Sequence, residues 1–209
     1  KAFCAGLDLT AGEQEDASGM SAQDSYLDDL GWVGRFTHTL RNTCDKPVVC
    51  GINGVAVGAG LALAMAGDIE IMAESARLMA GYPRIGGSPD GGLSYTLGQA
   101  LGYEQAMRFL LENRTVLGAE ALAMGMVAEV VADEQFDARF RQYCQQLTAV
   151  SPITARSTKR VMRNATRHAD LEGHLRYELV NIRRAFGSED GREARAAFIE
   201  KRAPTFKGR

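Results

Sequence analysis

The chain has 209 residues and a formal net charge of −2, because 24 lysines and arginines are set against 26 aspartates and glutamates. This near balance argues against a global basic field that would attract nucleic acid or an anionic membrane. The four cysteines lie far apart without CxxC or Cys/His spacing, and no apolar run approaches the roughly 20 residues that span a bilayer. We therefore expect a cytoplasmic protein without a disulfide framework, a structural zinc site or a membrane span.

The first residues, KAFCAGLDL, indicate the end of a strand that runs into a loop, and no initiator methionine precedes them. We expect the natural protein to continue upstream with further strands. Residues 10–29 are rich in Ser, Asp, Glu, Gln and Gly, a composition that predicts a mobile loop. Apolar residues at helical spacing then predict a helix over 30–43, which Pro47 ends.

Two strand patterns flank a run of small residues. The segment PVVCGINGVAVG, residues 47–58, carries the β-branched residues typical of strands, and it leads into GAGLALAMAG, which favours a helix. Alternation in DIEIMAES, residues 68–75, predicts another strand. The following GYPRIGGSPDGG, residues 81–92, is dense in Gly and Pro and therefore predicts a loop, which we expect to carry the chemistry.

Helices dominate the remainder of the sequence. Patterning predicts a helix over 93–110, a short helix over 119–124 and a strand over 126–131. From residue 133 on, nearly everything is helical, with charged residues on one face and apolar residues on the other. We therefore predict an α/β core over 1–132 and a helical region over 133–209.

Common catalytic motifs are absent from the sequence. It has no HExxH, no GxSxG and no Walker loop, and the glycines of GVAVGAGLALA do not complete GxGxxG. Two glycine-containing turns, CAGLD and VGAG, offer backbone amides instead. Amides at the start of a helix have no intrahelical acceptor, so together these turns could hold an oxygen anion. The glycines also fit a second reading, in which they only permit close helix packing.

The motifs FCAGLDL, KPVVCGINGVAVGAGLALAMAGDI and IGGSPDGG, with the tail FIEKRAPTFKGR, resemble the crotonase superfamily, also called enoyl-CoA hydratase/isomerase, across essentially the whole chain. The resemblance implies a crotonase fold of repeated ββα units, with C-terminal helices that form a homotrimer or a dimer of trimers and with the first strands upstream of Lys1. It further implies a coenzyme A thioester as substrate and no separate cofactor or metal ion.

The resemblance also implies the site residues. Two backbone amides of the family hold the thioester oxygen, and they fall here on Leu7 and Ala59. Enolate formation puts negative charge on that oxygen, and removal of one such donor typically costs about 3 kcal/mol or more. Phe198 and Lys201 match contacts to the nucleotide part of coenzyme A from a neighbouring subunit, although Lys201 also fits a solvated charged face. The implied substrate-binding residues are Ala5, Gly6, Asp8, Gly58, Gly60, Ala62, Tyr82 and Ser88.

Two departures from the family pattern decide the predicted chemistry. Hydratases of the family carry two catalytic glutamates, and the matching positions are Ala62 and Tyr82. Asp90 remains, where dienoyl-CoA isomerases, ring-modifying phenylacetate-pathway isomerases and 4-chlorobenzoyl-CoA dehalogenases also place an aspartate. We therefore expect Asp90 to reach into an apolar acyl pocket and to transfer the proton. Pro-Asp-Gly is also a good turn sequence, and the tripeptide alone would favour that reading.

Three readings of Asp90 stay open. As an acid and base it would shift a double bond through an enolate, which favours isomerisation over hydration, while a hydratase variant that lacks both glutamates also stays open. As a nucleophile it would attack a halogenated aromatic ring. The dehalogenases pair this aspartate with a histidine and a tryptophan, and Arg35 and Tyr82 stand in their places. A noncatalytic paralogue that only binds acyl-CoA is the third reading, because loss of both glutamates is also what decay of activity would produce.

Overall fold

The computed structural model describes residues 2–9, 21–167 and 170–209. Its described residues form two compact units. The first draws on Lys1–Arg41 and Val48–Asp137, and the second on Asn42–Pro47 and Ala138–Arg209. The division after residue 132 that the sequence suggests stays a prediction.

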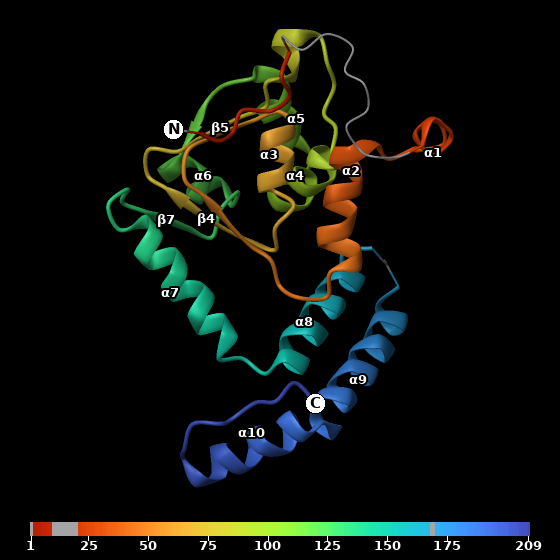
Figure 1. Cartoon of the computed structure of the whole chain (residues 1–209), viewed down its shortest axis with the longest axis vertical. Helices are drawn as coiled ribbons and strands as arrows, with labels where there is room; N and C mark the ends of the chain where they lie inside the picture. Colours follow the sequence, from red (N-terminus) through yellow and green to blue (C-terminus); the bar gives the residue numbers. More distant parts are fainter. Residues whose placement is uncertain (1, 10–20, 168–169) are drawn as a thin grey trace. The chain divides into compact units, whose positions relative to one another are not determined.

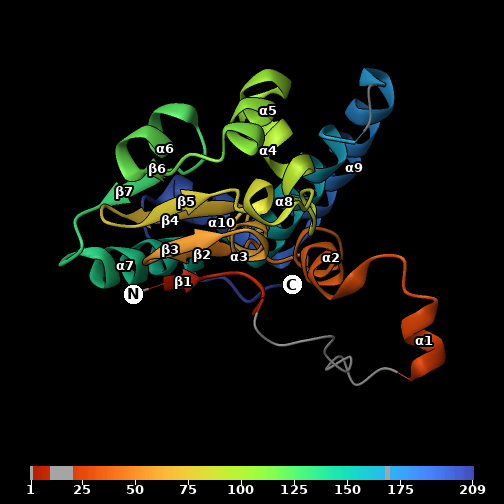
Figure 2. The ribbon, with the colours of Figure 1, turned by 90° about the horizontal axis from the view of Figure 1, so that it is seen from above.

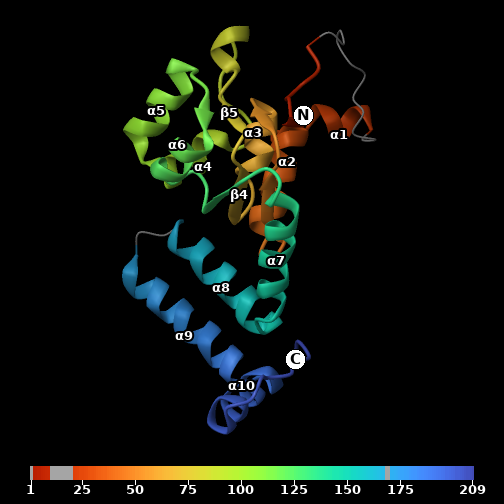
Figure 3. The same ribbon diagram turned by 90° about the vertical axis from the view of Figure 1, so that its left-hand side faces the viewer.

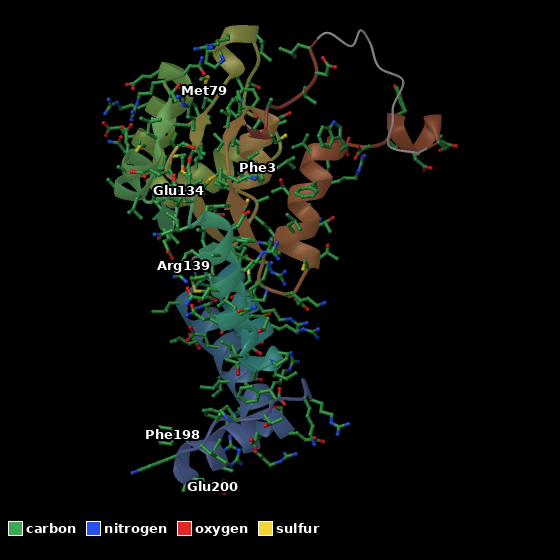
Figure 4. The ribbon with its side chains drawn as sticks, turned by 60° about the vertical axis from the view of Figure 1, so that its left-hand side comes forward. Phe3, Met79, Glu134, Arg139, Phe198 and Glu200 are labelled. Atoms are coloured by element: carbon green, nitrogen blue, oxygen red, sulfur yellow. The ribbon has the colours of Figure 1, made fainter. Side chains whose placement is uncertain are left out.

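Two small sheets build the first unit (Figure 1). One has the order β1-β3-β5-β6, in which the first three strands are parallel and β6 is antiparallel to β5. The other is parallel throughout, in the order β2-β4-β7. The bounds are β1 Ala2–Cys4, β2 Val49–Ile52, β3 Val55–Val57, β4 Ile69–Ala73, β5 Arg77–Met79, β6 Val116–Leu117 and β7 Glu129–Val131. Figure 4 labels Phe3 and Met79, which lie on the two strands beside β3.

The helices of the first unit connect and cover these strands. Their bounds are α1 Ala22–Tyr26, α2 Gly31–His38, α3 Ala59–Ala64, a 3₁₀ turn Tyr82–Ile85, α4 Leu93–Leu101, α5 Tyr103–Glu112 and α6 Gly118–Met124. A π-helical turn, Thr39–Thr43, follows α2. The predicted helix over 30–43 is thus found with a change of winding near its end.

Helix α3 consists of small and apolar residues, and this composition decides how near it comes to β1. A Cβ atom added at Gly60 would lie 2.2 Å from the carbonyl oxygen of Cys4, so no larger residue fits there. The helix contacts β1, β2 and β3 as well as α2 (Figure 2). Its side chains Leu61, Ala62 and Ala64 are almost completely buried. The close packing that the small residues predicted is therefore confirmed.

Several expectations about secondary structure are corrected. Within the predicted loop 10–29, residues 10–20 lie outside the described residues, and α1 forms after Ser21, whose hydroxyl accepts the amide of Asp24 at 3.1 Å. The predicted helix 93–110 is two helices, because Gly102 adopts φ +77° between them. The strand predicted over 126–131 is paired only from Glu129 on, and β5 and β6 fall in stretches for which no strand was predicted.

The second unit is helical. It holds most of α7 Phe136–Thr148, then α8 Pro152–Ala165, α9 Leu171–Gly187 and α10 Glu189–Glu200, and α8 and α9 lie side by side (Figure 3). Buried Asp190 anchors the C-terminal tail: its carboxylate accepts the amide of Lys207 at 2.7 Å and the hydroxyl of Ser151 at 3.0 Å. Across the described part of the chain, no helix is both long and apolar enough to cross a membrane.

Candidate active site

The two amide-bearing turns that the sequence singles out lie against each other. Gly6 adopts φ +91°, and a Cβ atom added there would lie 2.9 Å from the carbonyl oxygen of Val57 and 3.9 Å from the amide nitrogen of Ala59. The turn after β1 therefore touches the turn between β3 and α3, although more than 50 residues separate them in sequence. The amide of Leu7 directly follows this contact.

The turn before α3 is held from both sides. The amide of Gly58 donates to the carbonyl of Met79 at 3.3 Å, and its own carbonyl accepts the amide of Ala62 at 3.0 Å. Ala59 is the first residue of α3, where an amide has no intrahelical acceptor. This arrangement gives the backbone around Ala59 a fixed position and leaves its N–H suited to an external acceptor. Ala5, Leu7 and Asp8 are exposed on the opposing turn.

The loop 81–92 is anchored at both ends by side chains from other elements. The amide of Gly81 donates to Oδ1 of Asn113 at 2.7 Å, and the hydroxyl of Thr37 on α2 donates to the carbonyl of Gly91 at 2.7 Å. Sequence reasoning missed both Asn113 and Thr37. In the sequence, Asn113 is a polar residue after α5 and Thr37 is a polar residue among the apolar residues of α2. Neither pattern indicates that the residue binds the backbone of loop 81–92.

Tyr82 and Asp90 form a hydrogen-bonded pair within this loop. The phenol of Tyr82 donates to Oδ1 of Asp90 at 2.7 Å. Desolvation by burial raises the pKa of Tyr82, and the hydrogen bond and negative charge of Asp90 raise it further. The phenol therefore stays protonated at neutral pH and acts as a donor. Tyr82 was predicted among the substrate-binding residues, and the structure gives its hydroxyl an intramolecular partner.

The surroundings of Asp90 differ from those expected. The side chain is exposed in the structure, whereas the sequence suggested an apolar pocket. Asp90 lies between the exposed part of the loop and the start of α4, where the described residues do not cover it. Ser88, two residues earlier, is exposed as well. Among the described residues, the loop therefore supplies an anchored backbone and the buried phenol of Tyr82, while Asp90 itself is exposed.

Ala62 occupies a tightly packed position beside the same loop. It is 1% exposed, and a Cβ atom added at Gly91 would lie 3.0 Å from its Cβ and 2.4 Å from Cγ1 of Val33. Residues three apart lie on one face of a helix, so Ala62 follows Ala59 along α3. The contact with Gly91 thus brings the residue next to Asp90 against α3, the helix that begins at Ala59.

Phe198 and Lys201 lie in the second unit, at the end of α10. Figure 4 labels Phe198 and the neighbouring Glu200. Phe198 is 85% exposed. Lys201 is exposed and ends the helix with φ +55°. Within the described ranges, no group of three or more His, Cys, Asp and Glu side chains is arranged to hold a metal ion.

Residues 1–209 match the family model described as Enoyl-CoA hydratase/isomerase. The chain belongs to this family. Its fold is the crotonase fold: it superposes on the crystal structure of an enoyl-CoA hydratase from Bacillus anthracis with a TM-score of 0.85, at 28% identity, over 100% of this chain and 78% of that one. The α/β fold that the sequence predicted is confirmed.

Curated members of the enoyl-CoA hydratase/isomerase family carry different activities in their names. The chain is 34% identical to "1,2-epoxyphenylacetyl-CoA isomerase" of Escherichia coli (strain K12) and 32% identical to "Carnitinyl-CoA dehydratase" of Salmonella typhi. In each case the match covers 100% of this chain and 78% of the relative. Membership of the family therefore does not decide whether this chain isomerises, hydrates or dehydrates its substrate.

Proposed function

We propose that this family member isomerises an unsaturated or cyclic acyl-CoA, with its thioester oxygen bound by the amides of Leu7 and Ala59 and its proton moved by Asp90. The contact of Gly91 with Ala62 carries the proposal, because it brings the Asp90 loop to the helix whose first amide belongs to the oxyanion turn. A base on the loop packed beside α3 and an oxyanion site at the first residue of α3 can act on the same acyl group.

The proposed steps balance within the acyl group. The Asp90 carboxylate takes a proton from the carbon beside the thioester carbonyl, and the C–H electrons pass into an enolate whose negative oxygen accepts from the two amides. For a 3-enoyl-CoA, the enolate is conjugated with the double bond. The protonated Asp90 then returns the proton to the far carbon, which gives the 2-enoyl isomer and restores the carboxylate. These steps use backbone amides and one carboxylate, and we propose that they need no cofactor.

Isomerisation fits the site better than hydration. Addition of water requires one group to activate the water and another to protonate the substrate, and hydratases of the family use two glutamates. Here Ala62 has no ionisable group, and Tyr82 is a neutral donor already paired with Asp90. The isomerase name of the Escherichia coli relative supports the same choice. Arg35, in the place of the dehalogenase histidine, forms an ion pair with Asp28 and does not favour dehalogenation.

The test combines a substrate panel with deuterium exchange. Crotonyl-CoA, a 3-enoyl-CoA, a ring-containing acyl-CoA and 4-chlorobenzoyl-CoA are each incubated with the enzyme in D₂O, and products and deuterium content are measured by mass spectrometry. We expect isomerisation and exchange with the second or third compound, and loss of both in Asp90→Asn. Glu104→Gln changes an exposed carboxylate on α5 to an amide and serves as the matched control. Exchange that survives in Asp90→Asn would exclude the aspartate as the base.

We further propose that the second unit mediates assembly into a homotrimer or a dimer of trimers and contributes Phe198 and Lys201 to coenzyme A binding. The unit carries an apolar groove of about 1280 Å³ between α8, α9 and α10. The large apolar side chains Leu175, Leu179 and Ile182 on α9 are each about half exposed in the isolated chain. An apolar surface of this extent is typical of protein contacts. Sedimentation analysis should give three or six times the chain mass, and a monomer would contradict the proposal.

A further inference from the structure

We infer that Tyr82 is a positioning residue for Asp90: its phenol holds Oδ1 of the carboxylate, so that Oδ2 is presented to the reacting carbon. The inference rests on the proposed function, in which Asp90 moves the proton. It adds a role for the residue that stands where hydratases carry their second glutamate. A neutral donor at that position would hold the remaining carboxylate rather than activate a water.

Burial and backbone hydrogen bonds hold Tyr82 in place, whereas Asp90 is exposed and depends on Tyr82 for its orientation. The tyrosine is 7% exposed and begins the 3₁₀ turn, where its carbonyl accepts the amide of Gly87 at 3.0 Å. The preceding amide, that of Gly81, is held by Asn113 at 2.7 Å. An exposed aspartate samples several rotamers, and fixing one of them carries an entropic cost. The 2.7 Å bond from a buried, anchored phenol selects one orientation of Asp90 before substrate binds.

The hydrogen bond also gives the two carboxylate oxygens of Asp90 different roles. In the described part of the chain, the phenol of Tyr82 is the side-chain donor to Asp90, and it donates to Oδ1. The lone pairs of Oδ2 are not engaged by another described side chain, so this oxygen can accept the proton. A phenol whose pKa is raised by burial remains a donor throughout the neutral range and does not compete as a base. Tyr82 thus acts through Asp90 and not on the substrate.

The pair differs from a two-carboxylate site in its electrostatics. Two nearby carboxylates repel each other, and one of them tends to retain a proton. A phenol in place of the second carboxylate removes that repulsion and adds a donor to the ionised form of the first. The Tyr82 position therefore favours a single carboxylate that cycles between base and acid.

Tyr82→Phe in the full chain tests the inference, with Tyr103→Phe as a matched control on an 81% exposed tyrosine. The substrate is the panel compound that the wild-type enzyme isomerises. We expect kcat to fall about 10- to 100-fold with KM changed less than about 2-fold, since misorientation of a catalytic group acts on the chemical step. Tyr103→Phe should match the wild type in both measurements.

Incorporation of 2,3-difluorotyrosine at position 82 covers the case in which Tyr82→Phe fails to fold. This analogue keeps the ring and the hydroxyl that donates to Oδ1 of Asp90, so kcat should stay within about 2-fold of the wild-type value. Unchanged kcat in Tyr82→Phe would overturn the positioning role, as would a rise in KM as large as the fall in kcat, or a loss of kcat in the difluorotyrosine protein. The proposed function would survive those results if Asp90→Asn were inactive. It would fail separately if the wild-type enzyme exchanged no proton, or if Asp90→Asn exchanged at the wild-type rate.

Discussion

Glu70 on β4 makes the stability of this protein depend on pH in a direction opposite to that of most carboxylates. Burial raises the pKa of Glu70 from 4.5 to about 7, and the charge of Asp68 adds to this. Arg41 lowers the pKa but does not offset the burial. The folded state therefore binds the proton more tightly than the unfolded chain, so the stabilisation is complete below pH 4.5 and is lost as pH rises through about 7.

The size of the stability change follows from the difference between the folded and unfolded pKa values of Glu70. A difference of 7 − 4.5 = 2.5 pKa units, at 1.36 kcal/mol per unit, corresponds to about 3 kcal/mol of unfolding free energy. This value is an upper estimate because the residue is partly accessible to solvent. It would be a substantial fraction of the stability of an ordinary domain, about 5–15 kcal/mol.

Urea unfolding between pH 5 and pH 8, at one protein concentration, measures the effect. In the wild type the Glu70 contribution should decline across this range, while Glu70→Gln should lack that decline and be the more stable form at pH 8. The difference between the two pH dependences isolates Glu70 from other titrating groups. Equal pH dependences of the unfolding free energy in both proteins would refute the reasoning.

Four further results are expected. Ala62→Glu should lower the unfolding free energy by about 2 kcal/mol or more, measured by urea unfolding, since it places a carboxylate at a position that is only 1% exposed; a variant as stable as the wild type would contradict this. Gly60→Ala should cost a similar amount, about 2 kcal/mol or more, measured by urea unfolding, through its clash with the Cys4 carbonyl. Asp190→Ala should cost about 3 kcal/mol at pH 7, because the tail amides and Ser151 lose their acceptor. Dialysis against a chelator should leave isomerisation unchanged, and loss of rate restored by a divalent metal would show that the proposed steps are incomplete.

The pH dependence of the Asp190 contribution has the opposite sign to that of Glu70. Burial opposes ionisation of Asp190, but the hydrogen bonds from Lys207, Ser151 and Gly208 outweigh it and hold its pKa below 3.8. This stabilisation is present above the unfolded pKa and is lost as pH falls through the folded one. Acid unfolding should therefore occur at higher pH in a variant that lacks one of these donors, Ser151→Ala, than in the wild type.

Local patterns predicted the parts of the fold that depend on neighbours in sequence. The small residues around Gly60 indicated a closely packed helix, and α3 is that helix. The glycine and proline residues of 81–92 marked an irregular segment, as observed. In the central strand β4, buried and exposed residues do not simply alternate: Ile71, Met72 and Ala73 are all buried. The strand lies between β2 and β7, and a parallel strand in the interior of a sheet can be buried on both faces.

The sequence by itself determined which chemical groups are available: the order of the family motifs indicated the two amides and Asp90, and the residues at 62 and 82 argued against two glutamates. Only the tertiary structure decided what those groups touch. The Tyr82 hydroxyl meets Asp90, Thr37 holds the carbonyl of Gly91, and Gly6 lies against the turn at Ala59. Such contacts depend on rotamers and on close approaches between distant segments, which no periodicity of apolar residues records.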